Sequence, residues 1–345
     1  MRLTLMPLLL CQIGLIFSPL SQAEVFEFGQ DRQTGNVFVS GYANIEAVNR
    51  FDAPSKLDLD DLSMFVSGQV NNLVNPFVEV ELSKQTLMRE GGGGDNGEVV
   101  VERFYNGMKL SDFDSFRVGK VLTPLGDWNL MHAAPLIPLI TRPYTTARGF
   151  NAYTTGIRWL HDTANGVNLE LYWQPKDEWF KRTTNQTIRN FHNVFGGHIN
   201  LPMGLMDKIG ASFQHGQLVE TGETYTLLGI NASRSFGKLR LEGEAITARF
   251  SGTVLPGPTG RRHASESGIF GLADYSVTPQ WHGILASEYY QDHTMDASSR
   301  STVIAVAYRP NVPTVLKFEY LHQAGESSPI APIHTGWKAA YSVMF

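Results

Sequence analysis

Apolar and polar side chains alternate along most of this chain with a period of two residues. In residues 37–47, Val37, Val39 and Ile45 alternate with polar side chains such as Asn44. The same alternation returns in residues 337–345 at the end of the chain. A period of two places apolar groups on one face of a β-strand and ionisable groups on the other. The pattern therefore predicts strands that separate an apolar surface from a polar one.

Sixteen such runs can be counted along the chain. They begin near Val37, Leu62, Phe77, Val99, Phe116, Tyr153, Asn168, Asn190, Lys208, Thr224, Lys238, Glu266, Trp281, Ser301, Val315 and Thr335. The 322 residues after position 23 leave about 20 for each strand, enough for a tilted membrane-spanning segment and a connection. We predict an all-β fold, a closed antiparallel transmembrane β-barrel of about 16 strands.

The connections between these runs divide into two kinds. Those after even-numbered strands are mostly short, at residues 71–76, 111–115, 236–237, 278–279 and 310–313. Those after odd-numbered strands are mostly long, at residues 85–98, 122–151, 175–189, 251–265 and 291–300. Short periplasmic turns and long extracellular loops are typical of outer-membrane barrels, whereas a soluble β-sandwich has no reason to keep such an asymmetry.

The first residues have the parts of a secretory signal. Arg2 is followed by a mostly apolar stretch, and Ser21, Gln22 and Ala23 offer a cleavage site. We predict a signal peptide at residues 1–23 and a single barrel domain at 24–345. Cys11, the one cysteine, lies in the signal, so the mature domain can form neither disulfides nor thiolate metal sites. An exported, cysteine-free chain fits the bacterial cell envelope.

Composition narrows the function further. The chain is 42% hydrophobic and 18% charged, too apolar for a disordered protein. Its formal net charge of −5 argues against nucleic-acid binding, which normally uses a basic patch.

The C-terminal strand carries a resemblance to known proteins. A last amphipathic strand that ends in an aromatic residue, here Phe345, resembles Gram-negative outer-membrane proteins, in which the barrel assembly machinery reads that strand. Sixteen strands with a longest third loop resemble the general porins over nearly the whole mature chain. This resemblance implies a homotrimer in the cell outer membrane, surrounded by lipid and lipopolysaccharide.

A second, local resemblance lies at the end of the fifth strand. Residues 117–126, with the sequence RVGKVLTPLG, are similar to a stretch of porins related to the phosphate-selective porins O and P. The arginine ladder and lysine cluster of those porins are not visible here as a repeated pattern.

The third long connection, residues 122–151, differs from the others. It is apolar and stiffened by prolines, and its ionisable residues are Asp127, His132, Arg142 and Arg148. By resemblance to porins we interpret it as a constriction loop folded into the barrel, with the two arginines as its cations. An exposed loop or a latch on a neighbouring subunit is the alternative.

Strand parity predicts which charged side chains line the lumen. The predicted wall residues are Glu79, Glu81, Arg158, Glu242, Glu244, Lys317, Glu319 and Lys338. Acids on the wall opposite basic residues of the loop would create a transverse electric field across the pore. The alternative is that these charges only hydrate the lumen and pair with one another. Parity fails in the fifth strand, because Arg117 and Lys120 cannot both point inward.

Catalytic and metal-binding motifs are missing from the sequence. The mature chain has no His-Glu-x-x-His, Gly-x-Ser-x-Gly, Cys-x-x-Cys or Walker motif. His192 and His198 lie on one face of a predicted strand, but they would be about 20 Å apart, too far to share a metal. We therefore predict no enzyme activity, no cofactor and no metal.

The leading interpretation is an outer-membrane porin, a water-filled channel for passive diffusion of small hydrophilic solutes. Arginine is charged at any relevant pH, so Arg142 and Arg148 would draw anions. The main alternative is a barrel whose role is not transport: an adhesin, a structural anchor or a barrel hydrolase. A soluble periplasmic β protein is a lesser alternative.

Overall fold

The computed structural model describes residues 36–131, 133–180, 189–204, 207–251, 265–292, 297–326 and 334–345. Within these ranges the chain forms sixteen strands and one short helix, α2 (Tyr144–Gly149). The strands are β1 (Asn36–Arg50), β2 (Lys56–Gln69), β3 (Asn75–Arg89), β4 (Glu98–Lys109), β5 (Asp114–Leu122), β6 (Tyr153–Asp162), β7 (Asn168–Gln174), β8 (Phe191–Pro202), β9 (Lys208–Leu218), β10 (Thr224–Phe236), β11 (Leu239–Ser251), β12 (Ser265–Ser276), β13 (Trp281–Asp292), β14 (Ala297–Asn311), β15 (Thr314–Gly325) and β16 (Gly336–Met344). No helix in the described ranges is long and apolar enough to cross a membrane. The predicted signal peptide lies outside these ranges and stays a prediction.

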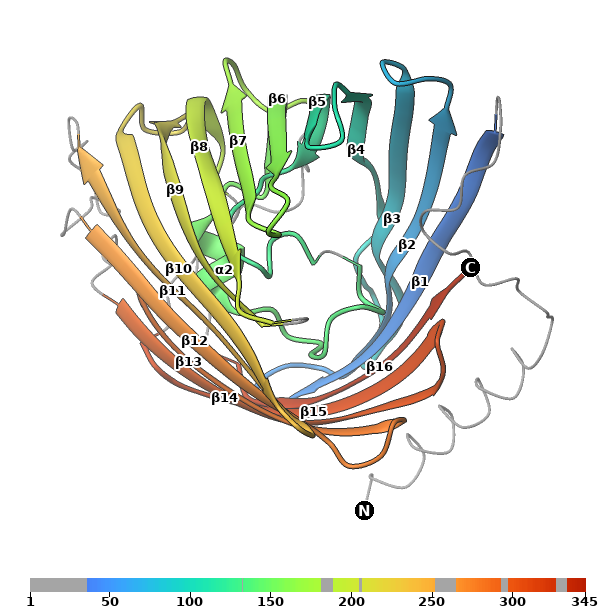
Figure 1. Ribbon diagram of the computed structural model, residues 1–345. Helices are drawn as coiled ribbons and strands as arrows, with labels where there is room; N and C mark the ends of the chain where they lie inside the picture. Colours follow the sequence, from blue (N-terminus) through green and yellow to red (C-terminus); the bar gives the residue numbers. More distant parts are fainter. Residues whose placement is uncertain are drawn as a thin grey trace.

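The strands form one closed ring (Figure 1). Each strand pairs antiparallel with its sequence neighbours, and β16 pairs with β1 to close the barrel. The last residue takes part in this closure, since the Phe345 N–H donates to the Gly41 carbonyl at 3.0 Å and the Gly41 N–H donates back at 2.8 Å. Each of the sixteen strands in the described ranges pairs with two neighbours, and the predicted all-β antiparallel barrel is confirmed.

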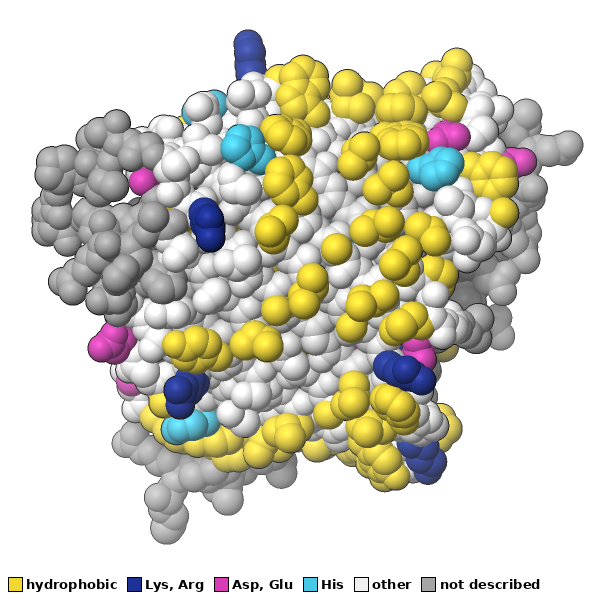
Figure 2. All heavy atoms as spheres, turned by 60° about the vertical axis from the view of Figure 1, so that its left-hand side comes forward, with side chains coloured by type: hydrophobic (Ala, Val, Ile, Leu, Met, Phe, Trp, Pro, Cys, Tyr) yellow, Lys and Arg dark blue, Asp and Glu magenta, His cyan; other side chains and the backbone are white. Residues whose placement is uncertain are grey.

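The two faces of the barrel wall have opposite chemistry. Outward side chains are apolar and exposed, as for Ile230, Leu285 and Ile304, whereas inward ones on the same strands include buried Asn231 and Glu288. Figure 2 shows hydrophobic side chains spread across the outer face, with charged side chains few and mostly toward its two ends. An apolar exterior on a sheet without edges is what a lipid environment requires.

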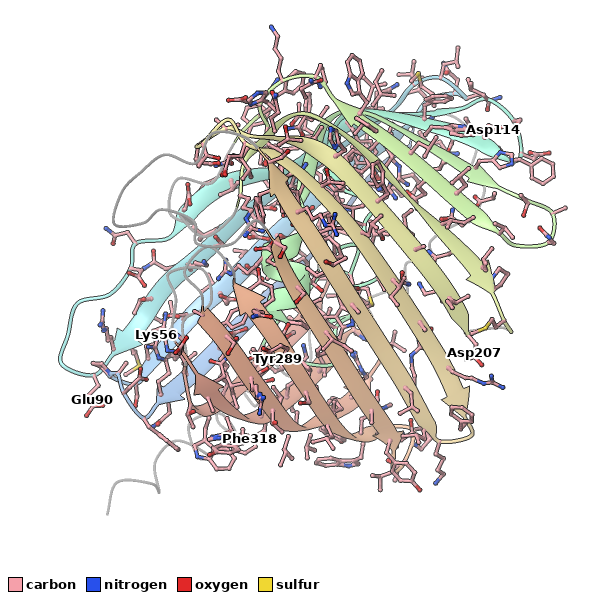
Figure 3. The ribbon with its side chains drawn as sticks, turned by 90° about the vertical axis from the view of Figure 1, so that its left-hand side faces the viewer. Lys56, Glu90, Asp114, Asp207, Tyr289 and Phe318 are labelled. Carbon is pink, nitrogen blue, oxygen red and sulfur yellow. The ribbon has the colours of Figure 1, made fainter. Side chains whose placement is uncertain are left out.

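The two ends of the barrel differ in their connections. In Figure 3, Asp114 and Asp207 mark the end formed by short turns, and Lys56 and Glu90 mark the opposite end. We call these the short-turn end and the long-loop end. The prediction of a long connection at residues 291–300 is wrong, because β13 continues to Asp292 and β14 begins at Ala297. Residues 51–55 and 219–223 at the long-loop end are also short connections.

Two local features correct or complete the parity argument. His192 and His198 do not share a face, because a register shift between His192 and Phe195 interrupts the alternation of β8. His198 is buried on the inner face, and His192 bonds to outward Gln217 at 2.8 Å. In β5 it is Arg117 that points inward, paired with Arg158 across the sheet.

Lys120 of β5 faces outward, yet its side chain is almost fully buried. The connection after β7 folds over it, so that the Lys120 ammonium pairs with Glu178 at 2.9 Å and donates to the Phe180 carbonyl at 3.0 Å. The outer face of β5 is therefore covered by protein at this point.

Candidate pore constriction

The connection between β5 and β6, residues 123–152, lies inside the ring of strands together with α2 (Figure 1). We call it the inner loop; residue 132 within it is outside the described ranges. Several of its large apolar side chains are buried, including Leu125, Trp128 and Leu139, whereas Leu136 is exposed. Exposing these apolar side chains to water would cost free energy, so their burial favours a loop that is folded into the barrel.

The inner loop is buried against an apolar part of the inner wall. One cluster joins Trp128, Ile137 and Leu139 to side chains of β12–β15, and a second joins Leu125 and Phe150 to β7–β11. The indole of Trp128 meets the ring of Phe270 edge-on, with centroids 5.2 Å apart. One side of the lumen is thus filled by a hydrophobic core, and polar inward side chains remain on β1–β5.

Glu288 of β13 fixes the start of α2. Its carboxylate accepts hydrogen bonds from the Tyr144 N–H at 3.0 Å, the Thr145 N–H at 2.6 Å and the Thr145 hydroxyl at 2.7 Å. Pro143 precedes the helix and provides no side-chain cap. A carboxylate from the wall therefore satisfies the first N–H groups of α2, as an N-capping side chain would do.

Two further wall residues hold the preceding part of the inner loop. Glu319 of β15 accepts from the Ile140 N–H at 2.9 Å, the Thr141 N–H at 3.1 Å and the Thr141 hydroxyl. Lys317 donates from its ammonium to the Ala134 carbonyl at 2.7 Å. Both wall side chains are buried, so they anchor the loop and do not line open water.

Glu244 of β11 anchors the beginning of the inner loop. It accepts from the Asp127 N–H at 3.1 Å and the Thr146 hydroxyl at 3.2 Å, and so joins the two halves of the loop. Gly126 has a positive φ of 60°, and a Cβ there would lie 2.6 Å from a Glu244 carboxylate oxygen. Asp127 pairs with Lys208 at 2.6 Å, so this acid too is an anchor.

Arg142 is held at the surface of the inner loop. Its guanidinium donates to the carbonyls of Trp128 at 3.2 Å and Met131 at 2.7 Å. It also interacts electrostatically with Asp60, Asp61 and Glu81 of β2 and β3. Burial lowers the pKa of Arg142 and these acids oppose the shift, but an arginine keeps its proton in either case.

Arg148 lies at the last turn of α2, away from Arg142 in sequence and in its contacts. Its guanidinium is 5.7 Å from the centroid of the Tyr144 ring, and it interacts electrostatically with Tyr290 and Arg189. The structure therefore does not bring the two predicted loop cations together. His132, the remaining predicted loop residue, lies outside the described residues.

The remaining predicted wall residues lie on the inner face with different surroundings. Glu79 and Glu81 are fully buried; Arg103 pairs with Glu79, and the Tyr42 hydroxyl donates to Glu81 at 3.2 Å. Arg158 is buried against Glu170. The others are less buried: Glu242 pairs with Arg240 at 2.6 Å, and Lys338 interacts electrostatically with Glu46.

Three arginines lie together on the inner face of β4–β6, a grouping that the sequence did not predict, although Arg158 was a predicted wall residue. Arg103, Arg117 and Arg158 line one cavity of about 210 Å³, together with Tyr105 and Leu130. They come from three strands and are brought together by the register. In contrast, no three metal-binding side chains cluster within the described ranges.

Solved structures with the same architecture are outer-membrane proteins. OmpT of Vibrio cholerae in its trimer form has a TM-score of 0.61 and 11% identity, over 91% of this chain and 100% of that chain. The anion-selective porin from Comamonas acidovorans has a TM-score of 0.58 and 13% identity, over 90% and 98%. The outer membrane channel DcaP of Acinetobacter baumannii has a TM-score of 0.61 and 12% identity, over 92% and 99%.

Similarity in sequence to known proteins is limited to a part of the chain. No protein-family model matches the chain. An uncharacterized protein of Aquifex aeolicus is 28% identical over 110 residues, which are 31% of this chain and 24% of that protein. The match therefore spans about a quarter of the length of that relative, and the likeness that covers the whole barrel is one of fold, shared with outer-membrane porins.

Proposed function

We propose that this protein is an outer-membrane channel through which small hydrophilic solutes diffuse passively, without a cofactor or a catalysed reaction. The observation that carries the proposal is a closed barrel with a loop inside it, whose Arg142 interacts electrostatically with Asp60, Asp61 and Glu81 of the wall. Opposite charges across a passage create a transverse field, which favours polar and charged solutes and penalises lipophilic ones. The inner loop is then the constriction, and its anchors keep the charges in place.

The proposed channel prefers anions over cations. Arg142 and Arg117 are permanently charged, and Arg117 forms no ion pair with a described carboxylate. Of the wall acids, by contrast, Glu244, Glu288 and Glu319 are bound to the inner loop and are withdrawn from the passage. One structural neighbour is itself described as an anion-selective porin, which fits this preference.

Replacing Arg142 with serine is expected to shift the reversal potential in a salt gradient toward cation selectivity, because the cation facing Asp60 and Asp61 is lost. The measurement is the zero-current potential of the reconstituted protein under a tenfold KCl gradient. Arg148→Ser is the matched control and should give a smaller shift in reversal potential. Arg148 lies in the last turn of α2, where its guanidinium packs against the Tyr144 ring. An unchanged potential in Arg142→Ser would show that Arg142 is outside the ion path.

We further propose a homotrimer assembled in the outer membrane, with lipid and lipopolysaccharide around it. Support comes from OmpT of Vibrio cholerae, described in a trimer form. The signal peptide at residues 1–23 and recognition of the last strand by the barrel assembly machinery belong to the same proposal. Phe345 suits that recognition, because its ring is exposed at the end of the chain.

A further inference from the structure

Aromatic rings form a row on the inner face of β2–β4, toward the short-turn end. The row consists of Phe65 in β2, Phe77 in β3 and Tyr105 in β4. All three side chains are half-buried. The Phe65 and Phe77 centroids are 6.1 Å apart, and those of Phe77 and Tyr105 are 5.0 Å apart, both pairs stacked. Aromatic faces on the polar side of a barrel wall are a surface on which a flat apolar solute can stack.

Guanidinium groups lie over this row. The Arg103 guanidinium carbon is 4.7 Å from the Phe77 centroid and 5.4 Å from the Phe65 centroid. The Arg117 guanidinium carbon is 5.3 Å from the Tyr105 centroid. Arginine planes stacked on rings remain available for hydrogen bonds at their edges, where a carboxylate can bind in a bidentate manner.

Tyr105, at one end of the row, lines the cavity of about 210 Å³ described above, which we call the Arg117 pocket. It is lined by Arg103, Arg117 and Arg158, with Tyr105, Leu122 and Leu130. Its volume is below the range of about 300–1,000 Å³ for pockets that take drug-sized ligands, so it suits a solute with a single ring.

The ion pairs of the pocket leave one positive charge. Arg103 pairs with Glu79 and Arg158 pairs with Glu170, whereas no described carboxylate pairs with Arg117. A single excess charge matches a monoanion better than a doubly charged phosphate. The Tyr105 ring and the apolar side chains of Val121, Leu122 and Leu130 provide contacts for a flat hydrocarbon body beside the arginines.

We propose that the Arg117 pocket is a binding site for aromatic monocarboxylates. The carboxylate pairs with Arg117, and the ring lies among Tyr105, the guanidinium planes and Leu130. This inference rests on the proposed channel, because a solute reaches the pocket from the aqueous lumen. It assigns that channel a substrate class that the transverse field alone does not specify.

The test uses benzoate as the probe and the full-length mature protein in detergent. Calorimetric titration should show benzoate binding more tightly than cyclohexanecarboxylate, which has the same charge but no aromatic face, and more tightly than inorganic phosphate. Arg117→Ser should weaken benzoate binding about tenfold, the size expected for a lost charge-assisted hydrogen bond. Tyr105→Leu should weaken the binding of benzoate and leave the binding of cyclohexanecarboxylate unchanged, because Tyr105 is the ring that lines the pocket.

Arg234→Ser is the matched control. Arg234 also lies over an aromatic ring, 5.3 Å from the Phe236 centroid, but on an exposed strand end outside the pocket. The Arg234→Ser variant should bind benzoate with the same affinity as the parent protein. Equal binding by the parent and Arg117→Ser, or equal binding of benzoate and cyclohexanecarboxylate, would overturn the proposal.

The proposed channel function is tested separately, by measuring single-channel currents in KCl. Current steps without benzoate binding would overturn the pocket and leave the channel intact. Benzoate binding without current steps would support the pocket and overturn the channel.

Discussion

Replacing Glu288 and Glu319 together with alanine is expected to release the inner loop and to raise the single-channel conductance. The two carboxylates accept hydrogen bonds from Ile140, Thr141, Tyr144 and Thr145. Each hydrogen bond to a charged group contributes about 1.5–3 kcal/mol, and its loss also leaves buried N–H groups without an acceptor. The loop should then move, so the current should become larger and noisier.

The measurement is the current amplitude and its fluctuation for single channels, with limited proteolysis of the inner loop as a second readout. Glu242→Ala is the matched control, because Glu242 faces inward but pairs with Arg240. It should keep the parent conductance. A double variant with the parent amplitude, noise and protease resistance would show that these carboxylates do not hold the loop.

Leu285→Arg is expected to destabilise the folded protein in lipid by about 2–4 kcal/mol, the cost of an arginine at the bilayer midplane. Leu285 lies in the middle of β13, pairs with Ala273 and Ile304, and is 53% exposed on the outer face. The measurement is the free energy of unfolding from urea titration in lipid vesicles.

Phe236→Arg is the control for this second experiment, because Phe236 is equally exposed but is the last residue of β10. At the interface the cost should be only about 0–1 kcal/mol. If the outer face were in contact with water, Leu285→Arg would change stability by no more than about 0.5 kcal/mol, as for other surface positions. That result would exclude a membrane-spanning barrel.

The sequence predicts the barrel because side chains that face lipid on the outer face of the barrel are apolar at every second position of a strand. Ile230, Leu285 and Ile304 must be apolar, and the groups next to them in sequence point inward. Strand number and closure follow from that alternation and from the placement of turns. Strand ends are less determined, as β13 and β14 show by extending into residues 291–300. A register shift such as that in β8 has no signature in the alternation.

A second feature of the sequence, besides the alternation of single strands, indicates that the inner loop lies inside the barrel. Segments of β12–β14 are apolar on both faces: Phe270 and Ile284 point inward, whereas Ile269 and Leu285 point outward. An apolar inner face in an aqueous lumen requires a cover, and the proline-rich connection at residues 122–151 is the apolar segment able to provide one. Strand segments that are apolar on both faces therefore indicate that the loop folds inside the barrel.

The roles of individual charges could not be read from parity. Glu79, Glu244 and Glu319 face inward, but only the three-dimensional structure shows that they are buried by Arg103 or by the inner loop. The Arg117 pocket depends on the register of three strands, which brings Arg103 and Arg158 beside Arg117. Residues that are distant in sequence and carry no motif leave no local pattern to find.

A conductance measurement in planar lipid bilayers tests the proposed channel most directly. Purified protein, folded as judged by its heat-modifiable migration on gels, is added to one side of a bilayer in 1 M KCl. We expect discrete current steps that vary linearly with voltage, because the passage beside the inner loop would stay filled with water. Folded protein that inserts into the bilayer and gives no steps would contradict an aqueous path through the barrel.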